Sequence, residues 1–370
     1  MIRPLTLVEL RVRDLRNLAH VQLEPAQRLN VIAGNNGQGK TSMLEAIYLL
    51  ATSRSFRTPR LAELVRHDSE VASVRGVFRE EWPGGPIARE QSVGVRGGRR
   101  TCRLDGSAPP SLTHYATRSP VVVFDPQQML LSTGPASERR TLLDRVTLFT
   151  HPEVDAHRAR YARALRERQF LLGDRTHALD CSAELDAYEQ LLAEHGAALT
   201  RARRAACEDL AKRIHEAFGR IATPGLALDA RYAPGGSEEE ALALERLRSM
   251  RRQDAQRKRT GFGPHLDDLG LMLDGHAARV VASQGQHRAI TLALKSAELA
   301  CIAEARGVLP ILLLDDVSSE LDAERTSALF EFLATTESQL FITTTRADLI
   351  VNGAGERRDF RVDGGVVETR

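Results

Sequence analysis

The sequence has 370 residues, of which 42% are hydrophobic and 27% are charged, and its formal net charge is +2. The length predicts two domains, and the composition is typical of a soluble globular protein, which excludes a wholly disordered or collagen-like chain. This small net charge does not by itself indicate a protein that binds nucleic acid. Whether the chain binds nucleic acid must be judged from where its charges lie.

Neither a membrane span nor a leader is expected. No segment approaches the roughly 18 apolar residues that a membrane-spanning helix needs, and the first four residues do not begin a signal peptide. We therefore expect a cytoplasmic protein with no membrane partner. The four cysteines form no CxxC pair, so they predict buried free thiols and neither a zinc site nor a disulfide framework.

The first part of the chain predicts a mixture of strands and one helix. Residues 5–12 and 28–33 have the apolar pattern of strands, and a glycine-rich loop follows the second of them. Residues 41–50 place their apolar side chains at helical spacing. Residues 70–124 predict further strands and turns, of which the last, 120–124, is a buried strand by composition.

The middle of the chain predicts helices. Apolar residues recur at alternating steps of three and four from Leu185 to Ile214, which is typical of one long helix with a coiled-coil-like seam. Residues 153–172 predict a partner helix. We interpret residues 127–255 as a helical domain inserted into the chain.

The last part returns to mixed α/β structure. A helix is expected to run to Arg306, and strands are expected at 308–314 and 339–343. We therefore expect an α/β fold whose head is formed by residues 1–126 and 256–370 together.

The glycine-rich loop fits the phosphate-binding pattern GxxxxGK[ST]. Its glycines allow the backbone N–H groups to face phosphate oxygens, and the following helix adds the positive end of its dipole. Lys40 is expected to reach the β and γ phosphates, and the Thr41 hydroxyl is expected to bind Mg²⁺. The predicted nucleotide-binding residues here are Gly34, Asn35, Asn36, Gly37, Gln38, Gly39, Lys40, Thr41 and Ser42.

An acidic pair ends the apolar run at residues 311–314. Ligands of open α/β sheets bind at the carboxyl ends of strands, so Asp315 is a candidate Mg²⁺ ligand. Asp316 is then a candidate base for the attacking water, and we group it with Lys40 and Asp315 as catalytic residues. The alternative is a structural role as a strand-end cap, which the phosphate-binding loop upstream disfavours.

Two further motifs follow the order found in ABC proteins. Ser283–Gln286 resembles the ABC signature loop, and its glycine lies 30 residues before Asp315. Ser283 is equally suited to be the N-cap of the next helix. Ser319–Asp322 resembles the D-loop, although alone it is also compatible with a simple helix start.

Several longer segments resemble the RecF family. Leu15–Leu18 is similar to its FRN(Y/F) element, with Leu15 in place of the aromatic residue. Gly134–Arg145 is similar to GSPxxRRxFLDR, and Gly263–Asp268 to GPHRDD, with Leu266 in place of arginine. Leu313–Asp322 is similar to LLLDDxxSELD. Gln127 departs from the glutamate that the family usually has at its position.

The resemblance implies an ABC/SMC-like P-loop ATPase head with an inserted helical domain. It implies ATP and Mg²⁺ as cofactors, with Arg16 and Asn17 near the nucleotide. It also implies that Ser283, Gly285 and Gln286 bind the γ-phosphate of ATP held by the other subunit of a homodimer.

Family resemblance also supplies the partners. It implies binding to double-stranded DNA and single-strand/duplex junctions, and action with RecO-like and RecR-like proteins in loading RecA at gaps. Asp316 stands in place of glutamate and no switch histidine follows the strand at 339–343, so we expect weak ATP hydrolysis that serves as a switch.

DNA contacts are expected from the basic run between Arg246 and Arg259, which holds seven basic residues and one acid. Such a run is able to neutralise several phosphates, favouring the DNA backbone over base sequence. A solvated helix face paired with nearby glutamates explains it equally well. The candidate DNA-binding residues are Arg251, Arg252, Arg257, Lys258 and Arg259.

Two other classes of function stay open on the sequence. A nucleotide-binding subunit of an ABC transporter is disfavoured by the long helical insertion and the missing switch histidine. A P-loop phosphotransferase acting on a small molecule is disfavoured by the signature-like loop, which such an enzyme does not need.

Overall fold

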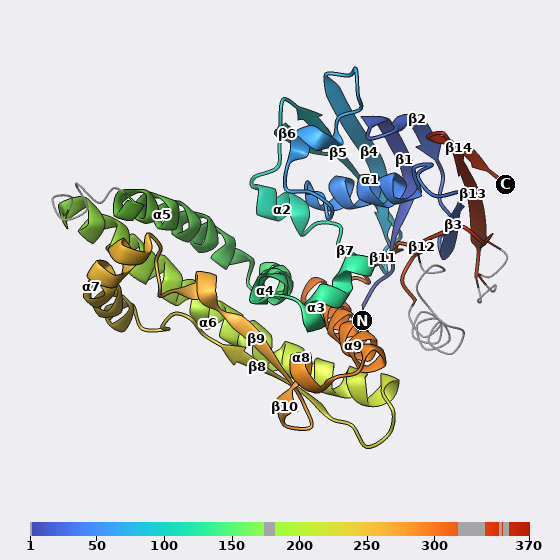
Figure 1. Cartoon of the computed structure of the whole chain (residues 1–370). Helices are drawn as coiled ribbons and strands as arrows, with labels where there is room; N and C mark the ends of the chain where they lie inside the picture. The colour runs from blue at the N-terminus through green and yellow to red at the C-terminus, as the bar shows by residue number, and fades with distance from the viewer. Residues whose placement is uncertain (1, 174–181, 317–336, 348–349, 351–354) are drawn as a thin grey trace. The chain divides into compact units, whose positions relative to one another are not determined.

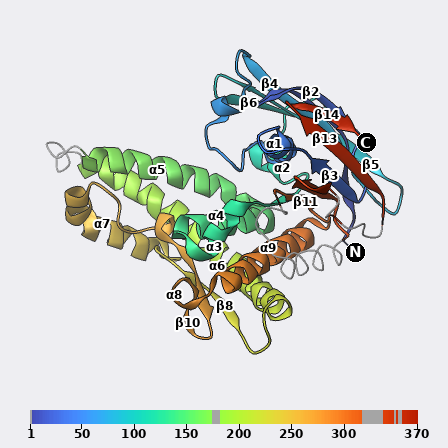
Figure 2. The same cartoon turned by 45° about the vertical axis from the view of Figure 1, so that its right-hand side comes forward.

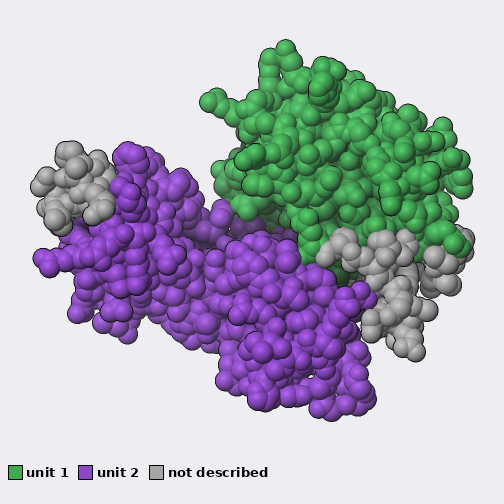
Figure 3. Space-filling view, viewed as in Figure 1, with its two compact units in different colours: residues 1–128, 302–370 green, residues 129–301 purple. Residues whose placement is uncertain are grey.

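The computed structural model describes residues 2–173, 182–316, 337–347, 350 and 355–370 (Figure 1). The chain divides into two compact units, unit 1 with residues 1–128 and 302–370, and unit 2 with residues 129–301 (Figure 3). This division groups residues 256–301 with the helical segment, so the domain boundary expected at 255/256 stays a prediction. The predicted D-loop, Ser319–Asp322, lies outside the described residues.

The larger sheet of unit 1 has six strands in the order β14-β13-β3-β12-β11-β7. All neighbours in it are parallel except the pair β13 and β14. Its central strands are buried along almost their whole length, as expected for apolar parallel strands. The strands are β3 (Leu29–Ala33), β7 (Val121–Phe124), β11 (Ile311–Leu314), β12 (Leu340–Thr344), β13 (Arg357–Asp363) and β14 (Val366–Thr369).

The second sheet of unit 1 is antiparallel, in the order β2-β1-β4-β5-β6. A bulge in β1 lies between Leu7 and Glu9, where the register with β4 shifts. Because a bulge adds one residue, the buried side changes from Leu5 and Leu7 to Leu10 and Val12. The strands are β1 (Leu5–Leu15), β2 (Leu18–Leu23), β4 (Val71–Glu80), β5 (Ile87–Arg96) and β6 (Arg99–Leu104).

Helix α1 (Lys40–Thr52) contacts strands of both sheets (Figure 2). Every residue from Ser42 to Ala51 is buried, so the helix has no solvent face. A helix that is surrounded by protein is apolar on nearly all sides. This explains why the apolar residues of 41–50 are spread around the helix and not confined to one face. The glycine-rich loop therefore leads into a buried helix that packs between the two sheets. Among the described residues, unit 1 also holds three short segments: η1 (Leu61–Leu64), α2 (Leu112–Ala116) and most of η2 (Pro126–Met129).

Unit 2 is built on α6 (Ser182–Ile221), a helix of 40 residues. The predicted stripe from Leu185 to Ile214 is confirmed as its buried side, where it packs against α5 (Asp155–Gly173) and α4 (Ala136–Thr150). The strands are β8 (Leu228–Ala233), β9 (Asp268–Leu273) and β10 (His276–Ala277). The remaining helices are α3 (Leu130–Thr133), η3 (Pro152–Val154), α7 (Glu240–Arg257), η4 (Pro264–Leu266), α8 (Ala278–Val281) and α9 (Gln284–Arg306), which continues into unit 1.

Two of the family-like segments meet in unit 2. Arg139, from Gly134–Arg145, forms a two-bond ion pair with Asp268 at 2.8 and 2.9 Å. Arg203 on α6 reaches both segments, with bonds of 2.7 Å to Asp144 and to the fully buried Asp267. These contacts join α4, α6 and the start of β9. Within the described part of the chain, no helix is long and apolar enough to cross a bilayer.

Candidate nucleotide-binding site

The carboxyl ends of three neighbouring parallel strands position the site. β3, β12 and β11 are adjacent in the sheet, so the residues that follow them meet at one edge. The phosphate-binding loop follows β3, Asp315 follows β11, and Thr343 lies near the end of β12. Thr41 and Asp315, which lie 274 positions apart in the chain, are therefore brought together by the order of the strands.

The loop depends on two glycines with positive φ, Gly37 at 81° and Gly39 at 119°. A Cβ on Gly39 would also lie 2.9 Å from the side chain of Asn17, so both the conformation and the space require glycine there. Asn35, Asn36 and Gly37 are exposed, whereas Lys40 is buried at the base of the loop. The loop thus has an open outer surface and a fixed cation beneath it.

The Lys40 ammonium is held by the loop itself. It donates to the carbonyl oxygens of Gly34 at 2.8 Å and Asn35 at 3.0 Å, and to Oδ1 of Asn36 at 3.3 Å. Burial lowers the pKa of Lys40, and the carboxylates of Asp316 and Asp315 oppose that shift. The three acceptors and the two carboxylates keep a cation at the place where phosphate oxygens are expected.

Asp315 lies between two hydroxyl groups. Its Oδ1 accepts hydrogen bonds from Thr41 Oγ1 at 3.0 Å and from Thr343 Oγ1 at 2.7 Å. Burial raises the pKa of Asp315, and the two hydroxyl bonds oppose the rise. Carboxylate and hydroxyl oxygens are the ligands that Mg²⁺ prefers, so Thr41 and Asp315 suit the predicted metal. Sequence reasoning missed Thr343, which orients Asp315.

Asp316 has a left-handed backbone conformation, with φ of 50°. Its N–H donates to Thr343 Oγ1 at 2.8 Å, so the same threonine fixes both aspartates. Aspartate and asparagine tolerate this conformation better than most residues. Such unusual backbone geometry is common at functional sites, where the surrounding structure enforces it.

These residues line a cavity of about 290 Å³. Arg57, in the loop after α1, also lines it, and no motif in the sequence pointed to this residue. Its guanidinium lies 3.4 Å from the buried Glu45 carboxylate. The remaining lining residues are Asn17, Asn36, Gly37, Gly39, Lys40, Thr41, Ser42, Asp315 and Asp316.

Arg16 and Asn17 differ in their placement. Asn17 lines the cavity, donates to the Gln38 carbonyl at 2.9 Å and accepts from Ser42 Oγ at 3.0 Å. Arg16 forms a two-bond ion pair with Glu45, both bonds 2.9 Å long. Arg16 therefore binds a residue of α1, whereas Asn17 forms a hydrogen bond with the glycine-rich loop itself.

Comparison with known proteins gives the family. The model of the RecF/RecN/SMC N terminal domain matches residues 6–363. The DNA replication and repair protein RecF of Anaeromyxobacter sp. (strain Fw109-5) is 42% identical, covering 98% of both chains. The protein of the same name from Myxococcus xanthus is 40% identical, covering 98% of this chain and 97% of its own. The chain belongs to the RecF family.

Solved structures agree with the assignment to RecF. A structure of the recombination mediator protein RecF with ATP in the RecFOR pathway has a TM-score of 0.87 and 28% identity, covering 100% of this chain and 99% of its own. The Smc head domain from Pyrococcus furiosus has a TM-score of 0.55 and 15% identity, covering 99% of this chain and 96% of its own, which shows the fold alone. The predicted ABC/SMC-like α/β head with a helical insertion is confirmed.

The signature-like loop of this RecF-family chain lies in unit 2, at the start of α9. Ser283 Oγ accepts from the Gln286 N–H at 3.3 Å, and Gln286 Oε1 accepts from the Ser283 N–H at 2.7 Å. This reciprocal pair is a capping box, so the N-cap role considered for Ser283 is present. The capping fixes the loop and leaves Gly285 at the first turn of the helix.

The basic run occupies the end of α7 in unit 2, and its members differ. Arg251 is held by Glu189 at 2.5 Å and by Asp186, and it is only 24% exposed. These hydrogen bonds raise its pKa. Four other basic residues of the run are exposed and form no ion pair with the described residues: Arg252, Arg257, Lys258 and Arg259. The structure therefore separates Arg251, which is engaged internally, from four cations that face solvent.

Proposed function

We propose that this chain is an ATP-dependent DNA-binding protein of replication and recombinational repair, acting as a dimer bridged by ATP. The observation that carries the proposal is the contact of Thr41 and Thr343 with Asp315 beside the buried Lys40. Family membership supports the repair role, and a related RecF structure is described with ATP. The mass of the protein on gapped DNA, with and without ATP, tests the proposal.

Each residue of the site has a distinct part in binding. The loop N–H groups and the Lys40 ammonium bind the phosphates of ATP. Thr41 and Asp315 would hold Mg²⁺, which supplies positive charge that shields the phosphate oxygens. Asn17 keeps the loop in place through Gln38 and Ser42. Arg57 adds a second cation at the cavity, and its charge favours the polyphosphate.

The dimer explains why the signature-like loop is preorganised. The capping box fixes Ser283 and Gln286, so these groups are ready to bind the γ-phosphate of ATP held by a second copy of the chain. Binding of ATP to the closed pair then stabilises the dimer by mass action. If DNA prefers the closed state, ATP raises the affinity for DNA, and DNA raises the affinity for ATP by the same factor.

Asp316→Asn tests the hydrolysis step. We propose that the Asp316 carboxylate positions the attacking water and accepts its proton. Asparagine has the same size and tolerates φ of 50°, so the loop should keep its shape. We expect single-turnover ATP hydrolysis to fall by about 100-fold or more, because a general base contributes about that much, while the Kd for ATP stays unchanged. Unchanged hydrolysis would remove Asp316 from the mechanism.

The exposed cations of α7 are proposed to contact the DNA backbone. Replacing Arg252, Arg257, Lys258 and Arg259 together with alanine should weaken binding at low salt. It should also make the slope of log affinity against log salt shallower, by up to about 3.6 for four lost phosphate contacts. Fluorescence anisotropy with labelled duplex at several salt concentrations measures the slope. An unchanged slope would place the DNA on another surface, and Arg220→Ala, an exposed arginine of α6, is the control.

The proposed partners follow from the family. We propose that the ATP-bound dimer marks double-stranded DNA and single-strand/duplex junctions, and that RecR-like and RecO-like proteins act with it to load RecA at gaps. The related structure described in the RecFOR pathway supports this assignment. Slow hydrolysis suits such a marker, because hydrolysis would release the dimer from DNA and would not drive movement.

A further inference from the structure

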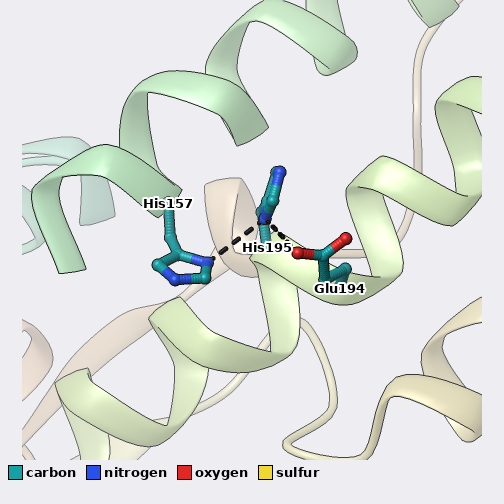
Figure 4. Close-up of side chains that lie close together, drawn as sticks. All are labelled: His157, Glu194 and His195. Atoms are coloured by element: carbon teal, nitrogen blue, oxygen red, sulfur yellow. Dashed lines mark hydrogen bonds and ion pairs between the residues drawn. The ribbon is translucent and has the colours of Figure 1, made fainter.

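Three potential metal ligands gather on two helices of unit 2, in a region that has no part in the proposed nucleotide site. His157 lies on α5, and Glu194 and His195 lie on α6 (Figure 4). The imidazole of His157 and the carboxylate of Glu194 both point toward Nδ1 of His195 (Figure 4). One ligand atom from each of the three residues lies within 4.8 Å of the other two.

The separations suit a tetrahedral ion. Nδ1 of His157 lies 3.2 Å from Nδ1 of His195, which lies 3.3 Å from Oε1 of Glu194. Ligand atoms about 2.0–2.1 Å from a tetrahedral Zn²⁺ are about 3.3–3.4 Å apart. These two separations therefore match two edges of a zinc coordination tetrahedron. In the absence of an ion, the short distance between the two nitrogens requires a shared proton, because two bare lone pairs repel each other.

Protonation and burial favour a metal ligand at His195. Its side chain is 3% exposed, and burial lowers its pKa, which favours the neutral ring that a metal ligand requires. Glu194 is 48% exposed, which leaves room for water as a fourth ligand. The charges of Glu194 and Glu240 attract a cation at His195, whereas the charge of Arg160 opposes it.

We propose that His157, Glu194 and His195 form a binding site for a divalent transition metal, with Zn²⁺ as the best-suited ion. Two imidazoles and one carboxylate are typical of zinc and its first-row neighbours, whereas Mg²⁺ and Ca²⁺ prefer oxygen ligands alone. The ion would take the place of the proton shared by the two rings. Since its ligands come from α5 and α6, it would join the two helices and stabilise unit 2.

Direct binding tests the site. Untagged full-length protein is stripped of metal and titrated with ZnCl₂ or CoCl₂ in excess Mg²⁺, which saturates oxygen-only sites. We expect one Zn²⁺ per chain and the visible bands of tetrahedral cobalt. At about 100 times the Kd, Zn²⁺ should raise the melting temperature by about 5 °C. No bound ion, or a spectrum of octahedral cobalt alone, would overturn the proposal.

Matched variants locate the ion. His157→Ala and His195→Ala should each weaken Zn²⁺ binding by at least about 10-fold and remove the tetrahedral cobalt bands. His215→Ala removes a more exposed histidine of the same helix and should change neither. His157 and Glu194 are less buried than His195, so His157→Ala and Glu194→Gln test the site if His195→Ala fails to fold. Unchanged Zn²⁺ binding in His157→Ala would contradict the site.

Discussion

Lys40→Ala is expected to weaken ATP binding by at least about 100-fold, as measured by titration with a fluorescent ATP analogue. A charge-assisted hydrogen bond contributes about 1.5–3 kcal/mol, and the buried Lys40 is expected to bind two phosphates. A loss of about 2.7 kcal/mol corresponds to 100-fold in affinity. The ammonium is held in place by Gly34, Asn35 and Asn36, so little ordering is required when ATP arrives.

Removing Lys40 also removes donors from the loop carbonyls, so the folded state needs a check. The control is Lys212→Ala, which removes an exposed lysine of α6. Lys212→Ala should bind ATP like the wild type, and both variants should keep the wild-type circular dichroism spectrum. ATP affinity in Lys40→Ala within a factor of three of the wild type would show that the loop is not the phosphate site.

Arg168→Ala is expected to lower the free energy of unfolding of unit 2 by about 3–5 kcal/mol. Arg168 is fully buried and bonds to Glu189 at 3.0 Å and to Asp254 at 2.8 Å. Its loss leaves Asp254 as a buried carboxylate without its cation, whereas Glu189 retains Arg251. Chemical denaturation followed by circular dichroism measures the change.

A nearby arginine provides the control for this result. Arg166→Ala removes an exposed side chain from the same helix, α5, and should change stability by no more than about 0.5 kcal/mol. The buried network joins α5, α6 and α7, so Arg168→Ala should also speed proteolysis of unit 2. Equal stabilities of Arg168→Ala and Arg166→Ala would show that the network contributes little.

The nucleotide site could be predicted to the extent that its signals are local. The loop from Gly34 to Thr41 carries its own spacing, and Asp315 follows an unmistakable apolar run. Thr343 and Arg57 carry no such signal, because a single threonine on a strand or arginine in a loop is common. Only the parallel pairing of β11 and β12 places Thr343 beside Asp315.

Long-range ion pairs were the main feature that the sequence left hidden. Arg251 belongs to a basic run by position, yet its acids Asp186 and Glu189 lie 65 and 62 residues away on α6. Arg16 is expected near the nucleotide, which stays a prediction, and its guanidinium is paired with Glu45, a contact that no motif indicated. The sequence shows how many basic residues a segment has. Tertiary packing decides which of them are paired with acids and which remain available to DNA or ATP.

The expected domain organisation rests on periodicity. Periodicity identifies helices and strands, but it does not say which other helices and strands they pack against. The long helix α6 follows directly from its stripe of apolar residues. Strand β9 follows the expected end of the helical domain, yet it pairs with β8 at 228–233 and belongs to unit 2. A change in periodicity therefore marks a change of structure, while the tertiary contacts of a strand decide its unit.

The most direct test of an ATP-bridged, DNA-bound dimer is the mass of protein on a gapped duplex. Binding is measured without nucleotide, with ATP and with ADP, at two salt concentrations, for the wild type and Lys40→Ala. We predict that two chains bind DNA with ATP, that ADP gives weaker binding, and that Lys40→Ala abolishes the ATP-dependent species. DNA binding that is absent in every nucleotide state, while ATP still binds, would contradict the account.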